Sequence, residues 1–199
     1  MMPYVVGLTG PLGAGKSTVA AMLRMLGAKV LDADGIVHDE QLRGTVGYSA
    51  IVQTFGTKVL GEDKEIDRAK LAEEVFGDPQ KLQRLERIMH PRVIARVLEA
   101  KGMLPDGAVL VIEAIKLLEG DLRKACDAIW VVVAPRRVMI ERLAERGMRA
   151  REAELRLANQ RTEEEFRAAA DVVIVNDGDR DRTLDQVRDA WDRLSRARA

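Results

Sequence analysis

A glycine-rich segment near the start of the chain constrains the fold more than any other feature. Residues 10–17 read GPLGAGKS, which matches the phosphate-binding loop pattern GxxxxGK[ST]. Glycines at positions 10, 13 and 15 permit backbone angles that a side chain would forbid, so N–H groups can converge on phosphate oxygens. Lys16 can then reach the outer phosphates, and the Ser17 hydroxyl can bind Mg²⁺. The sequence therefore predicts a nucleotide-phosphate site that includes Gly10, Gly13, Gly15, Lys16 and Ser17.

The segments on either side of this loop follow the order of strand, loop and helix that such a site requires. Residues 4–8 are short, apolar and β-branched, as expected for a buried parallel strand. Residues 17–26 carry apolar side chains at helical spacing, and the pattern stops at Gly27. The alternative is a glycine-rich turn that precedes a lysine by chance, and this context argues against it.

Acidic residues follow two of the other predicted strands. Apolar runs predict these strands over residues 28–32, 108–113, 127–133 and 171–176. Ligands of open α/β sheets bind beyond the carboxyl ends of the strands, which would bring Asp32, Asp34 and Glu113 near the loop. We expect Asp34 to accept a proton from a nucleophilic hydroxyl, and Asp32 and Glu113 to hold Mg²⁺ directly or through water. For both aspartates the alternative is a cap on the helix that follows, over residues 35–39.

Residues 44–101 form a charged, helical segment in which no strand is evident. Helices are expected over 45–56, 66–76 and 80–90, and Pro91 is expected to begin a further helix. The segment is much longer than a usual crossover between parallel strands, so we interpret it as an insertion that binds the second substrate. A purely structural appendage is the alternative. His90, Pro91 and Arg92 are expected to shape the substrate site, since no HxxxH pattern or neighbouring cysteine indicates a metal site.

After Pro135 the chain becomes rich in arginine, and residues 136–165 are predicted to form a helical lid. One helix ends at Gly147, and a second is expected from Arg151 to about Ala170. Arg142 and Arg146 are four residues apart, which places both guanidinium groups on one helix face. There they can pair with a transferring phosphoryl group while lid closure excludes water. The alternative is a solvated face, because glutamates alternate with the arginines. A last helix, from Thr183 to about Arg198, is expected to pack on the sheet.

Composition indicates one compact domain over residues 1–199, with a sizeable core. The formal net charge is zero, so nothing in it suggests a nucleic acid or a membrane as a partner. Cys126 is the single cysteine, which excludes an intrachain disulfide. No export leader and no long apolar run is present, so a cytoplasmic protein is expected, as a monomer or weak homo-oligomer.

The ordered motifs resemble the dephospho-CoA kinase family over nearly the full chain. In chain order the similar features are GLTGPLGAGKSTVA, LDADGIVH, FGTKVL, IDRAKLAEEVF, His90–Pro91, LLEG, ERLAERGM, NQR around Gln160 and ADVVIVNDGD. The resemblance implies an α/β P-loop kinase fold, similar to nucleoside-monophosphate kinases: a five-stranded parallel sheet flanked by helices, a helical CoA-binding insertion and a lid. It also implies ATP-dependent, Mg²⁺-assisted phosphorylation of the ribose 3′-hydroxyl of dephospho-CoA, the last step of coenzyme A synthesis.

The resemblance implies roles for individual residues as well. Residues Gly13 to Thr18 would hold the ATP phosphates, with Ala14 and Thr18 added to the loop residues above. Asp34 would be the base, Arg142 or Arg146 would stabilise the transferring phosphoryl group, and Asn176 would lie near the adenine. The chain departs from the family pattern at Lys116, where a proline is usual, and at His38, where an arginine is usual. Both positions face the acceptor in the family's arrangement, so they concern acceptor binding.

Two other functions remain open from the sequence. Another small-molecule kinase of this fold, acting on shikimate or a nucleoside, also suits an Asp-x-Asp motif after the second strand, although the long insertion favours a bulkier acceptor. A nucleotide-dependent switch without transferase activity is the second; its guanine-specific form needs an NKxD motif, whereas this chain has NDGD at residues 176–179.

Overall fold

The computed structural model describes residues 2–198, and contacts within the chain divide it into two compact units. One unit contains the residues up to Asp32 together with those from Met103 onward, and we call it the sheet unit. The other spans Ala33–Gly102, and we call it the helical unit. The predicted insertion, residues 44–101, lies inside the helical unit, which also contains the helix that follows Asp32.

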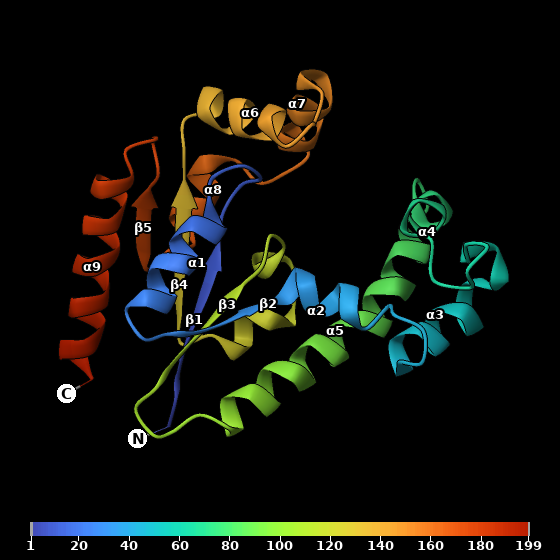
Figure 1. Cartoon of the computed structure of the whole chain (residues 1–199), viewed down its shortest axis with the longest axis horizontal. Helices are drawn as coiled ribbons and strands as arrows, with labels where there is room; N and C mark the ends of the chain where they lie inside the picture. The colour runs from blue at the N-terminus through green and yellow to red at the C-terminus, as the bar shows by residue number, and fades with distance from the viewer. Residues whose placement is uncertain (1, 199) are drawn as a thin grey trace. The chain divides into compact units, whose positions relative to one another are not determined.

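The sheet unit is built on five parallel strands in the order β2-β3-β1-β4-β5 (Figure 1). Their bounds are Tyr4–Thr9 (β1), Lys29–Asp32 (β2), Val109–Glu113 (β3), Ala128–Val133 (β4) and Val172–Val175 (β5). The five-stranded parallel sheet predicted from the sequence is thus confirmed. Because all strands run the same way, their carboxyl ends share one edge, where β1 leads into the glycine-rich loop.

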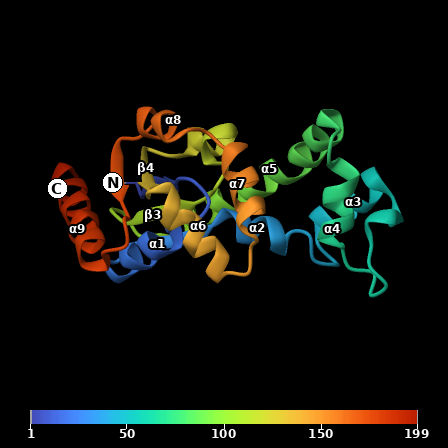
Figure 2. The same ribbon diagram turned by 90° about the horizontal axis from the view of Figure 1, so that it is seen from above.

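Helices cover both faces of this sheet. Their bounds are Lys16–Met25 (α1), Arg136–Glu145 (α6), Ala150–Ala158 (α7), Glu163–Ala168 (α8) and Arg180–Ala197 (α9). Two short 3₁₀ helices, Leu117–Glu119 (η2) and Asp121–Ala125 (η3), follow β3. Helices α1 and α9 pack against each other, α9 also contacts β5, and α8 contacts β4. Figure 2 shows α1 and α8 on opposite sides of the strands.

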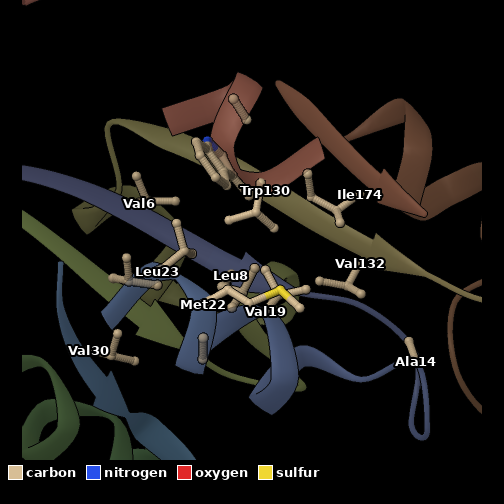
Figure 3. Close-up of a cluster of buried hydrophobic side chains, with 14 of the residues drawn as sticks. Val6, Leu8, Ala14, Val19, Met22, Leu23, Val30, Trp130, Val132 and Ile174 are labelled. Carbon is tan, nitrogen blue, oxygen red and sulfur yellow. The ribbon is translucent and has the colours of Figure 1, made fainter. Parts of the chain in front are cut away.

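The main core lies between the sheet and α1 (Figure 3). Leu8 of β1 and Trp130 of β4 are register partners, and both are buried. Trp130 is only 1% exposed, and Val19 and Leu23 of α1 belong to the same cluster. Complete burial of such a side chain contributes roughly 1.5–3 kcal/mol, so this cluster holds α1, and the loop before it, against the sheet.

The helical unit is organised around one long helix. Its elements are Ala33–Asp39 (α2), Val46–Phe55 (α3), the 3₁₀ helix Thr57–Val59 (η1), Arg68–Val75 (α4) and Pro79–Gly102 (α5). Helices α2, α3 and α4 each pack against α5. A second core contains Ile51, Phe55, Val59, Leu71 and Met89. Among residues 2–198 no helix has the length and apolar character needed to cross a membrane.

Two helix predictions were wrong in their boundaries. No new helix begins at Pro91; α5 continues through it. Proline removes one N–H donor and crowds the preceding turn, but Met89, Val93 and Val97 are buried at intervals of four residues, so packing on one face maintains the helix. The helix expected from Arg151 to about Ala170 is instead two helices. Thr162 starts the second with a capping box, accepting from the Glu165 N–H at 3.2 Å while its own N–H donates to Glu165 Oε2 at 2.7 Å.

Candidate active site

The glycine-rich loop has the backbone geometry that its sequence predicts. Gly10, Gly13 and Gly15 have φ values of 147°, 80° and 92°, in the region that side chains rarely adopt. All three also lie against other parts of the chain, and the space is tightest at Gly10 and Gly15. A Cβ on Gly10 would be 2.1 Å from the Val132 carbonyl oxygen, and one on Gly15 would be 2.0 Å from Asn176 Nδ2. Glycine is therefore required at both positions for the angle and for the space.

Lys16 is the first residue of helix α1, and its side chain turns back to the glycine-rich loop. It is 7% exposed, and its Nζ donates to the carbonyl oxygens of Gly10 at 3.0 Å and Pro11 at 3.1 Å. The first turn of α1 directs its backbone N–H groups toward the same region, and the helix dipole adds partial positive charge there. This arrangement suits a bound anion such as a phosphate chain.

Ser17 and two carboxylates form an oxygen-rich group next to the loop. Ser17 Oγ donates to Glu113 Oε1 at 2.8 Å, and Asp32 is the register partner of Glu113 on the neighbouring strand. Burial raises the pKa of Glu113; the nearby Asp32 charge adds to this, and the Ser17 hydrogen bond opposes it. The three residues predicted as metal ligands thus lie in the sheet unit, at the start of α1 and at the carboxyl ends of β2 and β3.

The chemistry of these three side chains fits Mg²⁺. Hard oxygen donors are what this ion prefers, and it usually keeps several waters while using only one or two carboxylates. Within residues 2–198 no group of three or more His, Cys, Asp or Glu side chains could enclose a metal ion. A site of this kind therefore depends on oxygen atoms from a bound substrate and from water in addition to the protein.

Arg142 and Asn176 hold the loop through hydrogen bonds to its carbonyl groups. Arg142 Nη1 donates to the carbonyl oxygens of Gly13 at 3.4 Å, Ala14 at 3.2 Å and Asn176 at 3.2 Å, and its Nη2 donates to Asn176 Oδ1 at 3.2 Å. Asn176 Nδ2 donates to the Ala14 carbonyl oxygen at 2.8 Å. Thr183 Oγ1 donates its one proton to the Asp179 carbonyl oxygen at 2.7 Å and lies 3.4 Å from Asn176 Oδ1. We call Arg142, Asn176 and Thr183 the anchor group.

A cleft of about 270 Å³ opens beside the loop. Arg146 is exposed and lines it, whereas Arg142 is half-buried. The planar guanidinium groups of arginine stack well on flat aromatic rings, and they also pair with phosphate oxygens. The lining residues come from the loop, from helices α1, α6 and α9, and from the turn after β5: Gly15, Thr18, Arg142, Glu145, Arg146, Asn176, Gly178 and Arg180.

The residues expected to bind the acceptor are distributed over both units. In the sheet unit, Lys116 is exposed after β3 and forms an ion pair with Glu119 at 3.6 Å. In the helical unit, Asp34 is exposed in the first turn of α2, so the helix begins before it and Asp34 is not its cap. His38 at the end of α2 is also exposed, as are His90 and Pro91 on α5.

Arg92 is half-buried within the helical unit. It donates to the Ile88 carbonyl and, at 3.4 Å, to the Val46 carbonyl, and its Nε lies 3.8 Å from Glu40 Oε2. Its contacts thus join α5 to α3 and to the segment after α2. Whatever its part in substrate binding, Arg92 also contributes to the packing of these helices.

Sequence reasoning assigned no role to Gln160, Thr183 or Arg180. Gln160 Oε1 accepts a hydrogen bond from the Leu12 N–H at 2.9 Å, so the segment between α7 and α8 supports the tip of the loop. Thr183 completes the anchor group, and Arg180 lines the cleft. The Gln160 contact joins residues 148 positions apart, Thr183 is a buried polar residue on a helix, and Arg180 is of a type common on helix surfaces, so periodicity gives no indication of their roles. The one signal in the sequence was the NQR motif around Gln160, which the family resemblance includes.

A family model for dephospho-CoA kinase matches residues 4–182 of the chain. The chain belongs to the dephospho-CoA kinase family. Dephospho-CoA kinases from Aquifex aeolicus and Thermobifida fusca are 41% and 39% identical to it; each alignment covers 96% of this chain, and 97% and 96% of the respective relative. The family resemblance predicted from the motifs is confirmed.

Solved structures agree with membership of the dephospho-CoA kinase family. The crystal structure of TT1252 from Thermus thermophilus has a TM-score of 0.87 at 31% identity, covering 98% of both chains. The dephospho-CoA kinase from Campylobacter jejuni has a TM-score of 0.72 at 25% identity over 100% of both chains. A shikimate kinase from Bacteroides thetaiotaomicron, at 16% identity and a TM-score of 0.54 over 96% of this chain and 98% of its own, shares the fold alone.

Proposed function

We propose that the protein transfers the γ-phosphoryl group of ATP to the ribose 3′-hydroxyl of dephospho-CoA, the last step of coenzyme A synthesis. The observation that carries this proposal is the dephospho-CoA kinase family match over residues 4–182, which includes an intact phosphate-binding loop. A shikimate-type kinase is not favoured, because the likeness to shikimate kinases is limited to 14–16% identity. A guanine-specific switch is not favoured either, because residues 176–179 read NDGD where such a switch has NKxD.

The loop binds the ATP phosphates through its backbone N–H groups, and Lys16 supplies a positive charge to the outer phosphates. The loop residues Gly10, Gly13, Ala14, Gly15, Ser17 and Thr18 surround the phosphate chain. Fixed donors of this kind stabilise charge that develops during transfer without having to reorganise. The nucleoside lies in the cleft beside the loop, with the adenine near Asn176 and its neighbours. There an arginine can stack on the base while the phosphates remain at the start of α1.

Ser17, with Asp32 and Glu113 directly or through water, would hold Mg²⁺. When bound, the ion neutralises negative charge on the outer phosphates. The Glu113 carboxylate also keeps the Ser17 hydroxyl oriented, as the 2.8 Å bond indicates. Of the two lid arginines, we assign Arg146 to the transferring phosphoryl group. Arg142 is engaged by the loop carbonyls, whereas Arg146 is exposed and lines the cleft.

Asp34 accepts the proton of the acceptor hydroxyl. Its position, two residues after the end of β2, resembles that of a base at the carboxyl edge of a parallel sheet, and its side chain is exposed. The acceptor is bound with the help of the helical unit, where His90, Pro91 and Arg92 are candidates, and of Lys116. Binding positions the hydroxyl in line with the phosphoryl group that it attacks.

The proposal is tested by incubating the protein with ATP and Mg²⁺ and following ADP release in the presence of dephospho-CoA, shikimate or nucleosides. We expect release with dephospho-CoA, with the phosphate recovered at the 3′ position by NMR of the product. ADP release with shikimate or a nucleoside but not with dephospho-CoA would show that the proposed acceptor is wrong, while the assignment as a kinase would stand. Tight ATP binding with no turnover on any acceptor would support a nucleotide-dependent switch.

A further inference from the structure

The carbonyl group of Ala14 is the point at which the anchor group holds the phosphate-binding loop. It accepts hydrogen bonds from Asn176 Nδ2 at 2.8 Å and from Arg142 Nη1 at 3.2 Å. Both donors come from segments that lie far from the loop in sequence: Arg142 from α6, and Asn176 from the residue after β5. Two donors on one oxygen restrict its direction more strongly than one would.

Peptide geometry converts this restraint into a direction for the next N–H group. The bond between Ala14 and Gly15 is trans, since no cis peptide bond occurs in the part of the chain that the structure describes. In a trans peptide the C=O and the N–H lie in one plane and point in opposite directions. With the Ala14 oxygen held toward Arg142 and Asn176, the Gly15 N–H must point away from these two side chains.

Asn176 is fitted closely into this position. It is 4% exposed, and its backbone N–H donates to the Val133 carbonyl at 2.8 Å, which fixes it to the end of β4. Its Oδ1 accepts from Arg142 Nη2 at 3.2 Å and its Nδ2 donates to Ala14, so both ends of the amide are engaged inside the protein. A Cβ on Gly15 would be 2.0 Å from its Nδ2, so the glycine also permits the approach. A side chain engaged in this way is not available to read the edge of a nucleotide base.

We propose that Asn176 is a positioning residue of the phosphate site: together with Arg142 it fixes the Ala14 carbonyl and thereby directs the Gly15 N–H at the nucleotide phosphates. The inference rests on the proposed function for the identity of the ligand. It implies that the Asn176 side chain contributes to the binding of any nucleoside triphosphate equally and does not discriminate between bases.

The test compares Asn176→Asp with the parent protein, using ATP and GTP as phosphoryl donors at saturating dephospho-CoA. The aspartate has the same shape but places an oxygen against the Ala14 carbonyl oxygen, which repels it and releases the peptide. Loss of one fixed donor to developing charge typically costs about 100-fold in rate, so we expect kcat/KM for ATP and for GTP to fall by about that factor. The ratio of the two values stays at the parent value, and KM for dephospho-CoA stays unchanged.

Two further variants keep the test decisive. Thr183→Val keeps the side chain's shape but removes the hydroxyl that lies 3.4 Å from Asn176 Oδ1 and donates to the Asp179 carbonyl at 2.7 Å, so a decrease of at most roughly fivefold is expected. If Asn176→Asp does not fold, the same constancy of the ATP to GTP ratio is expected in Thr183→Val. Gln80→Glu makes the same change from amide to carboxylate on an exposed side chain with no assigned role and is expected to leave both values at the parent level.

Binding of inorganic tripolyphosphate, measured by calorimetry, separates this proposal from the proposed function because it requires no acceptor. We expect weaker tripolyphosphate binding in Asn176→Asp than in the parent. Unchanged tripolyphosphate binding together with a changed ATP to GTP ratio would overturn the inference and make Asn176 a base-reading residue. A parent protein that binds tripolyphosphate but does not phosphorylate dephospho-CoA would contradict the function and leave the positioning role intact.

Discussion

At the scale of single residues, the positive charge of Lys16 is nearly enclosed by the protein. Burying a charged ammonium group costs free energy unless polar partners replace its water, and the Gly10 and Pro11 carbonyls supply such partners. The same group is proposed to bind the outer phosphates of ATP. We therefore expect Lys16 to contribute to ligand binding more than to folding stability.

Lys16→Ala is therefore expected to lower kcat/KM by at least about 100-fold, with weaker ATP binding, because a fixed charge beside the phosphates is lost. Its melting temperature is expected to equal or exceed that of the parent, because a buried charge is removed. Steady-state kinetics and thermal unfolding measure the two effects. Lys29→Ala, at an exposed position at the start of β2, serves as the control. Activity close to that of the parent in Lys16→Ala would overturn the phosphate assignment.

Asp34→Asn tests the proposed base separately from nucleotide binding. Loss of general-base catalysis typically costs 10²–10⁴-fold, so kcat is expected to fall by about this range while the Kd for ATP changes little. Asp39→Asn, at the other end of the same helix, provides a matched control with an exposed carboxylate. Turnover that remains near normal in Asp34→Asn would remove this residue from the mechanism.

At the scale of helices and strands, the sequence predicted the strands better than the helix ends. Buried apolar runs such as residues 128–133, which lie between Asp127 and Pro135, are bounded by a polar residue or a proline, so their limits are visible in the sequence. The helix ends are set by effects other than periodicity. Packing of one face, a tertiary effect, carries α5 through Pro91. The capping box at Thr162 divides a pattern that reads as a single helix, and its Thr-x-x-Glu signature is present in the sequence but was not used in the prediction.

Within the helical unit, one ionised side chain connects three elements. Glu74 of α4 forms ion pairs with Lys58 of η1 and Lys81 of α5, each at 2.6 Å. Hydrogen bonds from these lysines, Lys58 first, hold the pKa of Glu74 below its ordinary value of 4.5. A lowered pKa means that folding favours the ionised form, so the stabilisation is present above about pH 4.5 and is lost as the pH falls through the lowered pKa.

Glu74→Gln is accordingly expected to melt at a lower temperature than the parent at pH 7, with the difference disappearing in acid below the lowered pKa. High salt should reduce the difference at pH 7, because exposed ion pairs are screened. Far-UV circular dichroism between pH 3 and pH 8 measures this, and Glu73→Gln on the exposed neighbouring residue is the control. A difference in melting temperature that is independent of pH would assign the effect to packing.

At the scale of the whole molecule, the order of motifs predicted that the glycine-rich loop lies at the carboxyl edge of the sheet and that Glu113 lies near it. Both follow from parallel strands that end at one edge, which is a property of the topology. The orientation of Arg142 could not be predicted in this way. The guanidinium group has five N–H donors, which can bind a phosphate or the loop carbonyls equally well. Which of these acceptors Arg142 meets depends on distances in the folded chain. The same holds for Gln160, whose partner Leu12 lies at the other end of the sequence.

ATP and dephospho-CoA are expected to protect different parts of the chain from amide hydrogen exchange. ATP with Mg²⁺ should slow amide exchange in residues 10–18, 142–146 and 176–180, because these segments form the loop, the anchor group and the cleft. Dephospho-CoA should slow exchange within Ala33–Gly102, the unit proposed to bind the acceptor. Hydrogen–deuterium exchange by mass spectrometry measures both, and chelation of Mg²⁺ should weaken the first effect. Protection by ATP confined to α3–α5 would contradict the assignment of the nucleotide site.

Both tryptophans, Trp130 in β4 and Trp191 in α9, belong to the sheet unit, and the helical unit contains none. Intrinsic tryptophan fluorescence therefore reports on the sheet unit and not on the helical unit. Trp130, shielded from water, should emit in the blue and shift to the red only when the central strands separate. Loss of structure confined to residues 33–102 would pass unseen in such a measurement, while ellipticity would record it. A fluorescence curve and an ellipticity curve that fail to coincide would thus reveal that the two units melt in separate steps.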